Sequence, residues 1–170
     1  TAGETILRNV QPLFSELHSG GFALAHNGHI TNAFTIRETL VKDGAIFQST
    51  SDTEVVIHLV ARAKSGEFID RFIEALRQID GGFAFVGLSG DCMVGARDRF
   101  GIRPLLIGRI GEHYLLASET CALDMIGAKF VREVEAGEVV VINADGIRSF
   151  RAYPEVEPRP CVFEFVYFAR

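Results

Sequence analysis

The second half of the chain constrains the fold most, because it consists of short apolar and β-branched runs separated by turn signals at hairpin spacing. The runs are FAFVGLS, CMVGAR, PLLIG, YLLAS, EVVVIN and IRSFRAY. Turn-forming residues separate them at Ser89-Gly90-Asp91, at 108–111 and at Asp145-Gly146. Strands joined by tight turns pair antiparallel. We therefore expect an antiparallel meander, which is interrupted only by a brief helix near 119–126.

The first half has a different periodicity, with apolar residues recurring at helical spacing. This spacing predicts helices at 32–43, from Ser51 onward, and at roughly 67–79. Ser51 and Glu54 predict a capping box at the start of the second helix. Helices followed by an antiparallel meander favour an α+β fold over a parallel βαβ architecture.

Residues 21–26 form a short apolar run that predicts a buried strand, and Asn27-Gly28 follows it directly. Asn-Gly is the commonest two-residue hairpin turn, which is one interpretation. In the other, the carboxamide NH2 of Asn27 and the N–H of Gly28 point at one oxygen. Two uncharged donors fixed in this way form an oxyanion hole for acyl transfer.

Composition limits the class of protein. The 170 residues are 48% hydrophobic and 23% charged, which indicates one folded domain with a sizeable core. A net charge of −5 argues against nucleic acid or an anionic membrane as a partner, so a small molecule or another protein is expected. The sequence shows no signal peptide and no apolar run long enough to cross a bilayer, and we expect a cytoplasmic protein.

The usual nucleophile and metal motifs are missing from the sequence: it has no GxSxG, HExxH or phosphate-binding P-loop. The three cysteines, Cys92, Cys121 and Cys161, are widely spaced without a CxxC pair, which indicates reduced thiols and no structural zinc. We expect Cys92 and Cys121 to be small core residues.

Four further polar residues have both a structural and a functional interpretation. His26 and His29 are either hydrogen-bonded structural groups or general bases. Asp52, within TSDTE, is either a helix cap or a ligand for a substrate ammonium group. Asp98, within ARDRFGIRPL, is expected to be buried in an ion pair with one of the nearby arginines, Arg97, Arg99 or Arg103.

The sequence at the end of the chain predicts a connection to another domain. Residues 153–160 are rich in proline and predict a linker, and the apolar run 162–169 predicts a strand. An apolar strand needs neighbours, so we expect the natural polypeptide to continue into another domain.

Four stretches together, LAHNGHITNA, TSDTEVV, ARDRFGIRPLLIG and CVFEFVYFAR, resemble the glutaminase domain of the glutamine phosphoribosylpyrophosphate amidotransferases. This resemblance covers the whole chain. It implies a fold of the N-terminal-nucleophile hydrolase type, a four-layer αββα sandwich of two antiparallel sheets. It also implies a glutaminase domain at 1–152, a linker and first strand at 153–170, and a phosphoribosyltransferase domain beyond them in a homo-oligomer.

The resemblance also implies the chemistry. A cysteine thiolate attacks the carboxamide of glutamine, and the ammonia released converts phosphoribosyl pyrophosphate to phosphoribosylamine. Asn27 and Gly28 match the oxyanion hole, Asp52 the carboxylate that holds the α-ammonium group, and Thr1 a neighbour of the substrate carboxylate. The nucleophilic cysteine is expected upstream of Thr1, so that this chain alone would be inactive.

No cofactor is expected in the chain itself, whereas Mg2+ is expected in the phosphoribosyltransferase domain. Some members of the family carry an iron–sulfur cluster, and Cys161 matches the position of one ligand. Two alternatives remain: the glutaminase domain of another amidotransferase, such as asparagine synthetase or glucosamine-6-phosphate synthase, or a non-catalytic assembly domain on the same fold.

Overall fold

The computed structural model describes residues 4–64, 66–90, 92–154, 156–159, 161–163 and 166. Within these residues the strands form two antiparallel sheets, of order β1-β2-β3-β4-β8-β9 and β6-β5-β7. The strands are β1 (Leu13–Leu17), β2 (Gly20–Ile30), β3 (Gly81–Ser89), β4 (Cys92–Arg97), β5 (Leu106–Ile110), β6 (His113–Ala117), β7 (Lys129–Glu133), β8 (Glu138–Asn143) and β9 (Gly146–Arg151). The helices are η1 (Leu7–Asn9), α1 (Ala33–Lys42), α2 (Thr53–Arg62), α3 (Phe68–Leu76) and α4 (Thr120–Met125). The α+β class and the two antiparallel sheets are confirmed.

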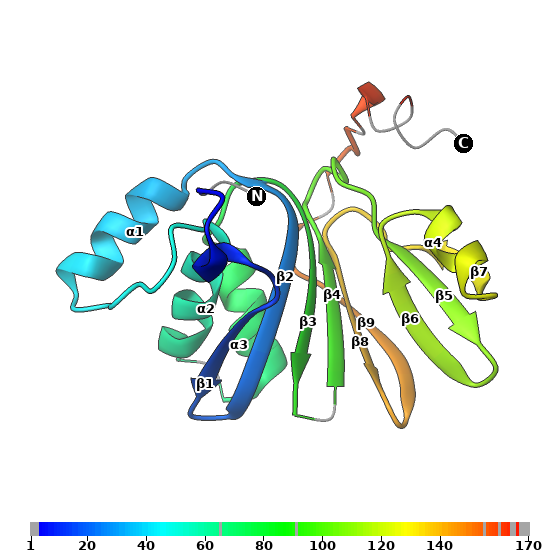
Figure 1. Cartoon of the computed structure of the whole chain (residues 1–170), viewed down its shortest axis with the longest axis horizontal. Coiled ribbons are helices and arrows are strands. Elements are labelled where there is room, and N and C mark those ends of the chain that lie inside the picture. The colour runs from blue at the N-terminus through cyan, green and yellow to red at the C-terminus, as the bar shows by residue number, and fades with distance from the viewer. Residues whose placement is uncertain are drawn as a thin grey trace.

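The elements are arranged in layers. Helices α1, α2 and α3 lie on one side of the larger sheet, and the smaller sheet lies on the other side with α4 beyond it (Figure 1). The main core packs α2 and α3 on the larger sheet, where Phe22 contacts Phe72 edge to face. A second core, which includes Val140 of β8 and Ile107 of β5, fills the space between the sheets. The larger sheet is therefore covered on both faces.

The three helices of the first half occur where the apolar periodicity predicts them, with slightly shorter ends. Helix α3 buries Phe72, Ile73 and Leu76 on one face. Helix α1 buries Leu40, but Phe34 is 73% exposed. The apolar spacing in α1 thus marks a helix correctly without marking a fully buried face.

The predicted capping box at α2 is wrong. The Glu54 carboxylate accepts hydrogen bonds from the backbone N–H groups of Gln48 and Ser49, both at 2.7 Å, so it binds the preceding loop. Ser51 acts locally instead, since its Oγ accepts a hydrogen bond from the N–H of Thr53 at 3.2 Å. The acidic side chain therefore fixes the loop that enters the helix.

Strand β2 is longer than the predicted strand and contains Asn27 and Gly28. These residues pair with Ala84 and Phe83 of β3, so the hairpin-turn interpretation of Asn27-Gly28 is wrong. Pairing with a distant strand decides the conformation here, and a local turn propensity does not.

Two strands, β1 and β7, were not predicted, and one prediction fails at the end of the chain. The described residues of the predicted strand at 162–169 are Val162, Phe163 and Val166, and all three are helical. The strand prediction is wrong for them, and the rest of that run lies outside the described residues. Among the described helices, none has the length and apolar character needed to span a membrane.

Candidate functional site

Asn27 and Gly28 lie in the half of β2 that leads to α1, and both are half-buried. Gly28 has a φ of 138°, far from the value near −140° of a regular antiparallel strand. A Cβ atom at this position would lie 2.1 Å from the carbonyl oxygen of Gly82. Only glycine fits, because both the backbone conformation and the close approach of β3 exclude a side chain.

The carboxamide of Asn27 has a defined orientation. Its Oδ1 accepts a hydrogen bond from Nη2 of Arg103, which lies in the connection between β4 and β5. A guanidinium group has only donors, so it must face the oxygen of the amide. The NH2 group is therefore on the other branch of the amide and is available as a donor elsewhere. The sequence marks Arg103 only as a candidate partner of Asp98, because a contact over 76 residues gives no local signal.

Asp98 is fully buried, as expected, but its bonds are different from those predicted. Oδ1 accepts from the N–H groups of Phe100 and Ile102, at 2.9 and 3.1 Å. Oδ2 accepts from the N–H groups of Phe83 and Arg103, both at 3.2 Å. The predicted ion pair is therefore replaced by backbone hydrogen bonds, which shape the loop 98–103.

Arg97 holds the same loop by donating to carbonyl groups of the loop. Its Nε donates to the carbonyl oxygen of Arg103 at 2.7 Å, and its Nη2 donates to that of Gly101 at 3.0 Å. The same guanidinium group donates to the carbonyl oxygen of Val134 at 2.8 Å. The adjacent side chains of Asp98 and Arg97 thus fix the loop: Asp98 accepts from its N–H groups, and Arg97 donates to its carbonyl groups.

Asp52 is 4% exposed and lies at the N-terminus of α2. Its carboxylate makes no capping hydrogen bond to the helix, so the capping interpretation is wrong. Instead, Oδ2 accepts a hydrogen bond from the backbone N–H of Ile30 at 3.0 Å. Ile30 is two residues after Gly28, about 7 Å along the strand. The structure therefore brings Asp52 to the same end of β2 as Asn27 and Gly28.

Both histidines that flank Asn27-Gly28 lie near Asp52. Nδ1 of His26 is 3.1 Å from Thr53 Oγ1 and 3.6 Å from Asp52 Oδ1. Nδ1 of His29 is 3.7 Å from Asp52 Oδ2, and its side chain is 61% exposed. Burial lowers the pKa of His26, although Asp52 raises it in part. The ring packs against Phe85, which favours the structural role for this neutral imidazole.

A cavity of about 280 Å³ opens beside Asp52, and its lining includes His29, Arg37, Thr50 and Asp52. Arg37, which the sequence did not single out, donates to the carbonyl oxygens of Ser49 and Ser51 and so braces the loop before α2. Asn27 and Gly28 do not line this cavity.

The beginning of the chain is attached next to this cavity. The backbone N–H of Glu4 donates to Thr50 Oγ1 at 3.1 Å, and Asn9 bonds both the side chain and the N–H of Thr50. Thr1, predicted as a neighbour of the substrate carboxylate, lies outside the described residues.

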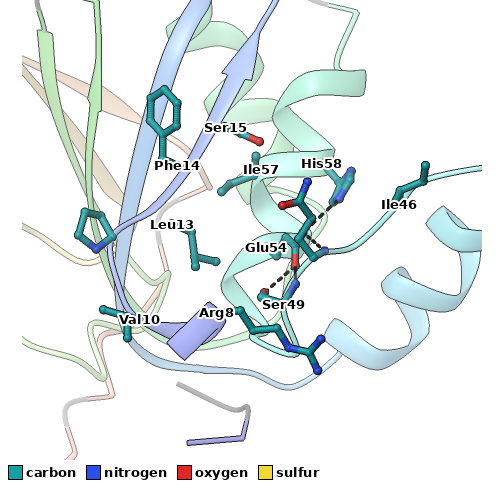
Figure 2. Close-up of a pocket in the computed structure, with 12 residues that line it drawn as sticks. Arg8, Val10, Leu13, Phe14, Ser15, Ile46, Ser49, Glu54, Ile57 and His58 are labelled. Carbon is teal, nitrogen blue, oxygen red and sulfur yellow. Dashed lines mark hydrogen bonds and ion pairs between the residues drawn. The ribbon is translucent and has the colours of Figure 1, made fainter. Parts of the chain in front are cut away.

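A second cavity, of about 360 Å³, lies between β1, α2 and the loop before α2 (Figure 2). Arg8, Phe14 and Ile46 line it, and Glu54 and His58 stand at its wall with an Nε2 to Oε1 separation of 3.8 Å. Burial lowers the pKa of His58 despite the nearby carboxylate. The Glu54 contacts are those that hold the entry to α2, so this cavity adds no reactive pair.

The three cysteines do not form a cluster in the described structure. Cys92 begins β4, where it pairs with Ser89 at the end of β3 and is half-buried. Cys121 is exposed on α4, so the prediction that it is a core residue is wrong. A four-thiolate cluster needs more cysteines than the chain contains. Among the described residues, no three metal-ligating side chains lie together. The role of Cys161 as a cluster ligand stays a prediction that requires thiolates from elsewhere.

Comparison with known proteins gives a family match over most of the chain. The family model described as "Glutamine amidotransferase domain" matches residues 4–125. An amidophosphoribosyltransferase of Rhizobium etli is 51% identical, over all of this chain and 35% of that protein. The chloroplastic amidophosphoribosyltransferase 1 of Arabidopsis thaliana is 44% identical, over 99% of this chain and 30% of that protein. The chain thus spans about a third of the length of these relatives.

Solved structures agree with this match. The glutamine phosphoribosylpyrophosphate amidotransferase of B. subtilis, in complex with ADP and GMP, superposes with a TM-score of 0.94 at 41% identity. The match covers 98% of this chain and 37% of that one. A class-II glutamine aminotransferase domain protein from Silicibacter pomeroyi has a TM-score of 0.58 at 15% identity, over 78% of this chain and 67% of that one, and shows a shared fold alone.

Proposed function

The chain belongs to the family of glutamine amidotransferase domains, and from this premise we propose that it is the glutamine-hydrolysing part of an amidophosphoribosyltransferase of purine biosynthesis. The relatives that carry this name are 42–51% identical over essentially the whole chain. The described site supplies what the first half-reaction needs from this chain: an oriented carboxamide, an adjacent glycine and a buried carboxylate.

The observation that carries the proposal is the arrangement along one end of β2. Asn27 has its amide oxygen bonded to Arg103, which leaves the NH2 group as a donor, and Gly28 follows in a conformation that only glycine adopts easily. Asp52 is bonded to Ile30, which lies about 7 Å along the strand from Gly28. The two donors stabilise the oxyanion, and Asp52 binds the α-ammonium group.

The proposed reaction proceeds through a thioester. A cysteine thiolate attacks the side-chain carboxamide carbon of glutamine, and the negative charge forms on its oxygen, where the Asn27 and Gly28 donors stabilise it. Ammonia then leaves, and water hydrolyses the γ-glutamyl thioester to glutamate. The ammonia displaces pyrophosphate from phosphoribosyl pyrophosphate to give phosphoribosylamine, a step assigned to a phosphoribosyltransferase domain.

The nucleophile is proposed to come from outside the 170 residues. Arg97 of β4 lies in the same row of the sheet as Asn27, with Ala84 between them. Cys92 is five residues from Arg97 along β4, which places it about 17 Å from that row. Thr1 is kept as a neighbour of the substrate carboxylate, a proposal supported by the bond of Glu4 to Thr50 beside Asp52. The homo-oligomeric state and the cytoplasmic location stay predictions.

The test uses the full polypeptide encoded by the reading frame that contains this chain. Glutamate and phosphoribosylamine should both form from glutamine and phosphoribosyl pyrophosphate. Asn27→Ala should lower glutamine-dependent turnover about a hundredfold or more, the usual loss for one oxyanion donor. Synthesis from added ammonium salt should be unchanged, because it bypasses the glutaminase reaction.

The outcomes separate the alternatives. Unchanged glutamine-dependent turnover in Asn27→Ala would refute the oxyanion role. Ammonia transfer to an acceptor other than phosphoribosyl pyrophosphate would identify a different amidotransferase. If glutamate is not released from glutamine by the unmodified protein, the domain has an assembly role.

A further inference from the structure

We propose that Arg103 is a positioning residue for the glutaminase reaction, because it fixes which end of the Asn27 carboxamide faces the substrate. This inference rests on the proposed function, since it takes Asn27 as an oxyanion donor. An amide side chain can rotate by half a turn about its last bond at little steric cost, because O and NH2 are nearly equal in size. In one orientation it offers a donor to the oxyanion, and in the other it offers a repulsive carbonyl oxygen.

The chemistry of Arg103 selects the productive orientation. Its Nη2 donates to Asn27 Oδ1, and a guanidinium group has no acceptor that could serve the flipped amide. A flipped Asn27 would place its NH2 donors against those of Arg103. The charge-assisted bond also polarises the amide, which strengthens the N–H groups on its opposite branch as donors.

Arg103 can do this only if its own position is fixed, and the loop 98–103 provides that. Its backbone N–H donates to Asp98 Oδ2 at 3.2 Å, and its carbonyl oxygen accepts from Arg97 Nε at 2.7 Å. Asp98 is fully buried, and the side chain of Arg97 is 12% exposed. The backbone of Arg103 is therefore held on both sides by charged groups.

The test compares Asn27→Ala, Arg103→Met and the double variant in the full-length protein, with kcat and KM measured for glutamine. Arg103→Met should lower kcat about tenfold to a hundredfold, the loss expected when a catalytic group is misplaced. The KM for glutamine and the ammonia-dependent rate should change little. In the double variant, the loss should be no greater than in Asn27→Ala alone, because there is no amide left to orient.

Two further variants control for folding and charge. Arg99→Met removes an arginine from the same loop whose guanidinium lies over Phe100 and 3.3 Å from Asp80, and it should leave kcat unchanged. Arg103→Lys keeps one positive donor without the planar fork, and it should recover part of the activity lost in Arg103→Met. It also keeps the test valid if the methionine variant does not fold.

The outcomes of this comparison are distinct. An unchanged kcat in Arg103→Met and Arg103→Lys, or losses that multiply in the double variant, would overturn the positioning role while leaving Asn27 as a donor. A rise in KM without a fall in kcat would also overturn it. Full activity in Asn27→Ala would overturn the proposed function itself.

Discussion

Asp52 bonds the backbone N–H of Ile30 at 3.0 Å, although it stands at the start of α2, so the helix is joined to β2 by the side chain that could have capped it. The four unsatisfied N–H groups that begin a helix normally attract such a carboxylate. Here the Asp52 carboxylate accepts from the strand instead. The carboxylate is thereby held at the end of β2 that contains Asn27 and Gly28, at the wall of a cavity.

Asp52→Asn should weaken glutamine binding and affect the chemistry less. The amide keeps an acceptor for Ile30 but loses the charge that would pair with the α-ammonium group. Loss of one partner of a buried charge pair costs about 2 to 5 kcal/mol, so KM should rise roughly thirtyfold or more. Asp43→Asn, in an exposed pair with Arg62, is the matched control and should leave KM unchanged. An unaltered KM in Asp52→Asn would contradict the binding role.

Gly28→Ala should be strongly destabilising. The added Cβ atom meets the carbonyl oxygen of Gly82 at 2.1 Å, and the strands must separate to admit it. Overpacking together with the strained φ should cost at least about 3 kcal/mol in urea unfolding. Gly44→Ala has a positive φ of 88° but nothing within 4 Å, so it should show only the cost of the backbone conformation. Equal costs for both variants would rule out the close approach as the cause.

Asp98→Asn should destabilise the loop 98–103 and lower glutaminase activity with it. Each carboxylate oxygen accepts two backbone N–H groups, so an amide NH2 would face two donors in either orientation. A cost of about 1.5 to 3 kcal/mol is expected, as for hydrogen bonds to a charged group. Asp80→Asn, at an exposed carboxylate near Arg99, serves as the control. A stable Asp98→Asn variant with full activity would show that the loop does not need the charge.

The predictable part of the fold was local. Helical spacing located α1, α2 and α3, because each needs only its own apolar face to be recognised. Strand β7 has almost no buried residues, so nothing in its sequence distinguishes an edge strand from a loop. Asn27-Gly28 has the composition of a turn, and only its pairing with β3 makes it part of a strand.

The site was predictable in its residue types but less so in its contacts. Asn27, Gly28 and Asp52 were singled out, and the structure places them at one end of β2. The burial of Asp98 was expected, whereas its backbone partners were not, because they depend on how the loop 98–103 folds around the carboxylate. The bond between Arg103 and Asn27 joins the β4–β5 connection to strand β2, which only the folded chain brings together.

The neutral state of His26 should make stability depend on pH. Burial lowers its pKa below the usual value of about 6.5 for histidine, so the unfolded chain binds the proton more readily than the folded one. The stabilising contribution is therefore complete above about pH 6.5 and is lost as the pH falls toward the lower folded pKa. Urea unfolding of His26→Gln should show a weaker fall in stability over this range. Asp52 lies 3.6 Å from the His26 ring and 3.7 Å from that of His29, so His29→Gln is the control. A slope equal to that of the unmodified protein would contradict the assignment.

The near contact of β2 and β3 at Gly28 has a consequence for how such a domain can diverge. There, the spacing of the two strands is set by main-chain atoms alone, with no side chain between them. Substitutions that accumulate in the surrounding core can alter the volume of the core without shifting the backbone N–H of Gly28. The position of this proposed oxyanion donor is thus independent of how the residues of the hydrophobic core change during evolution.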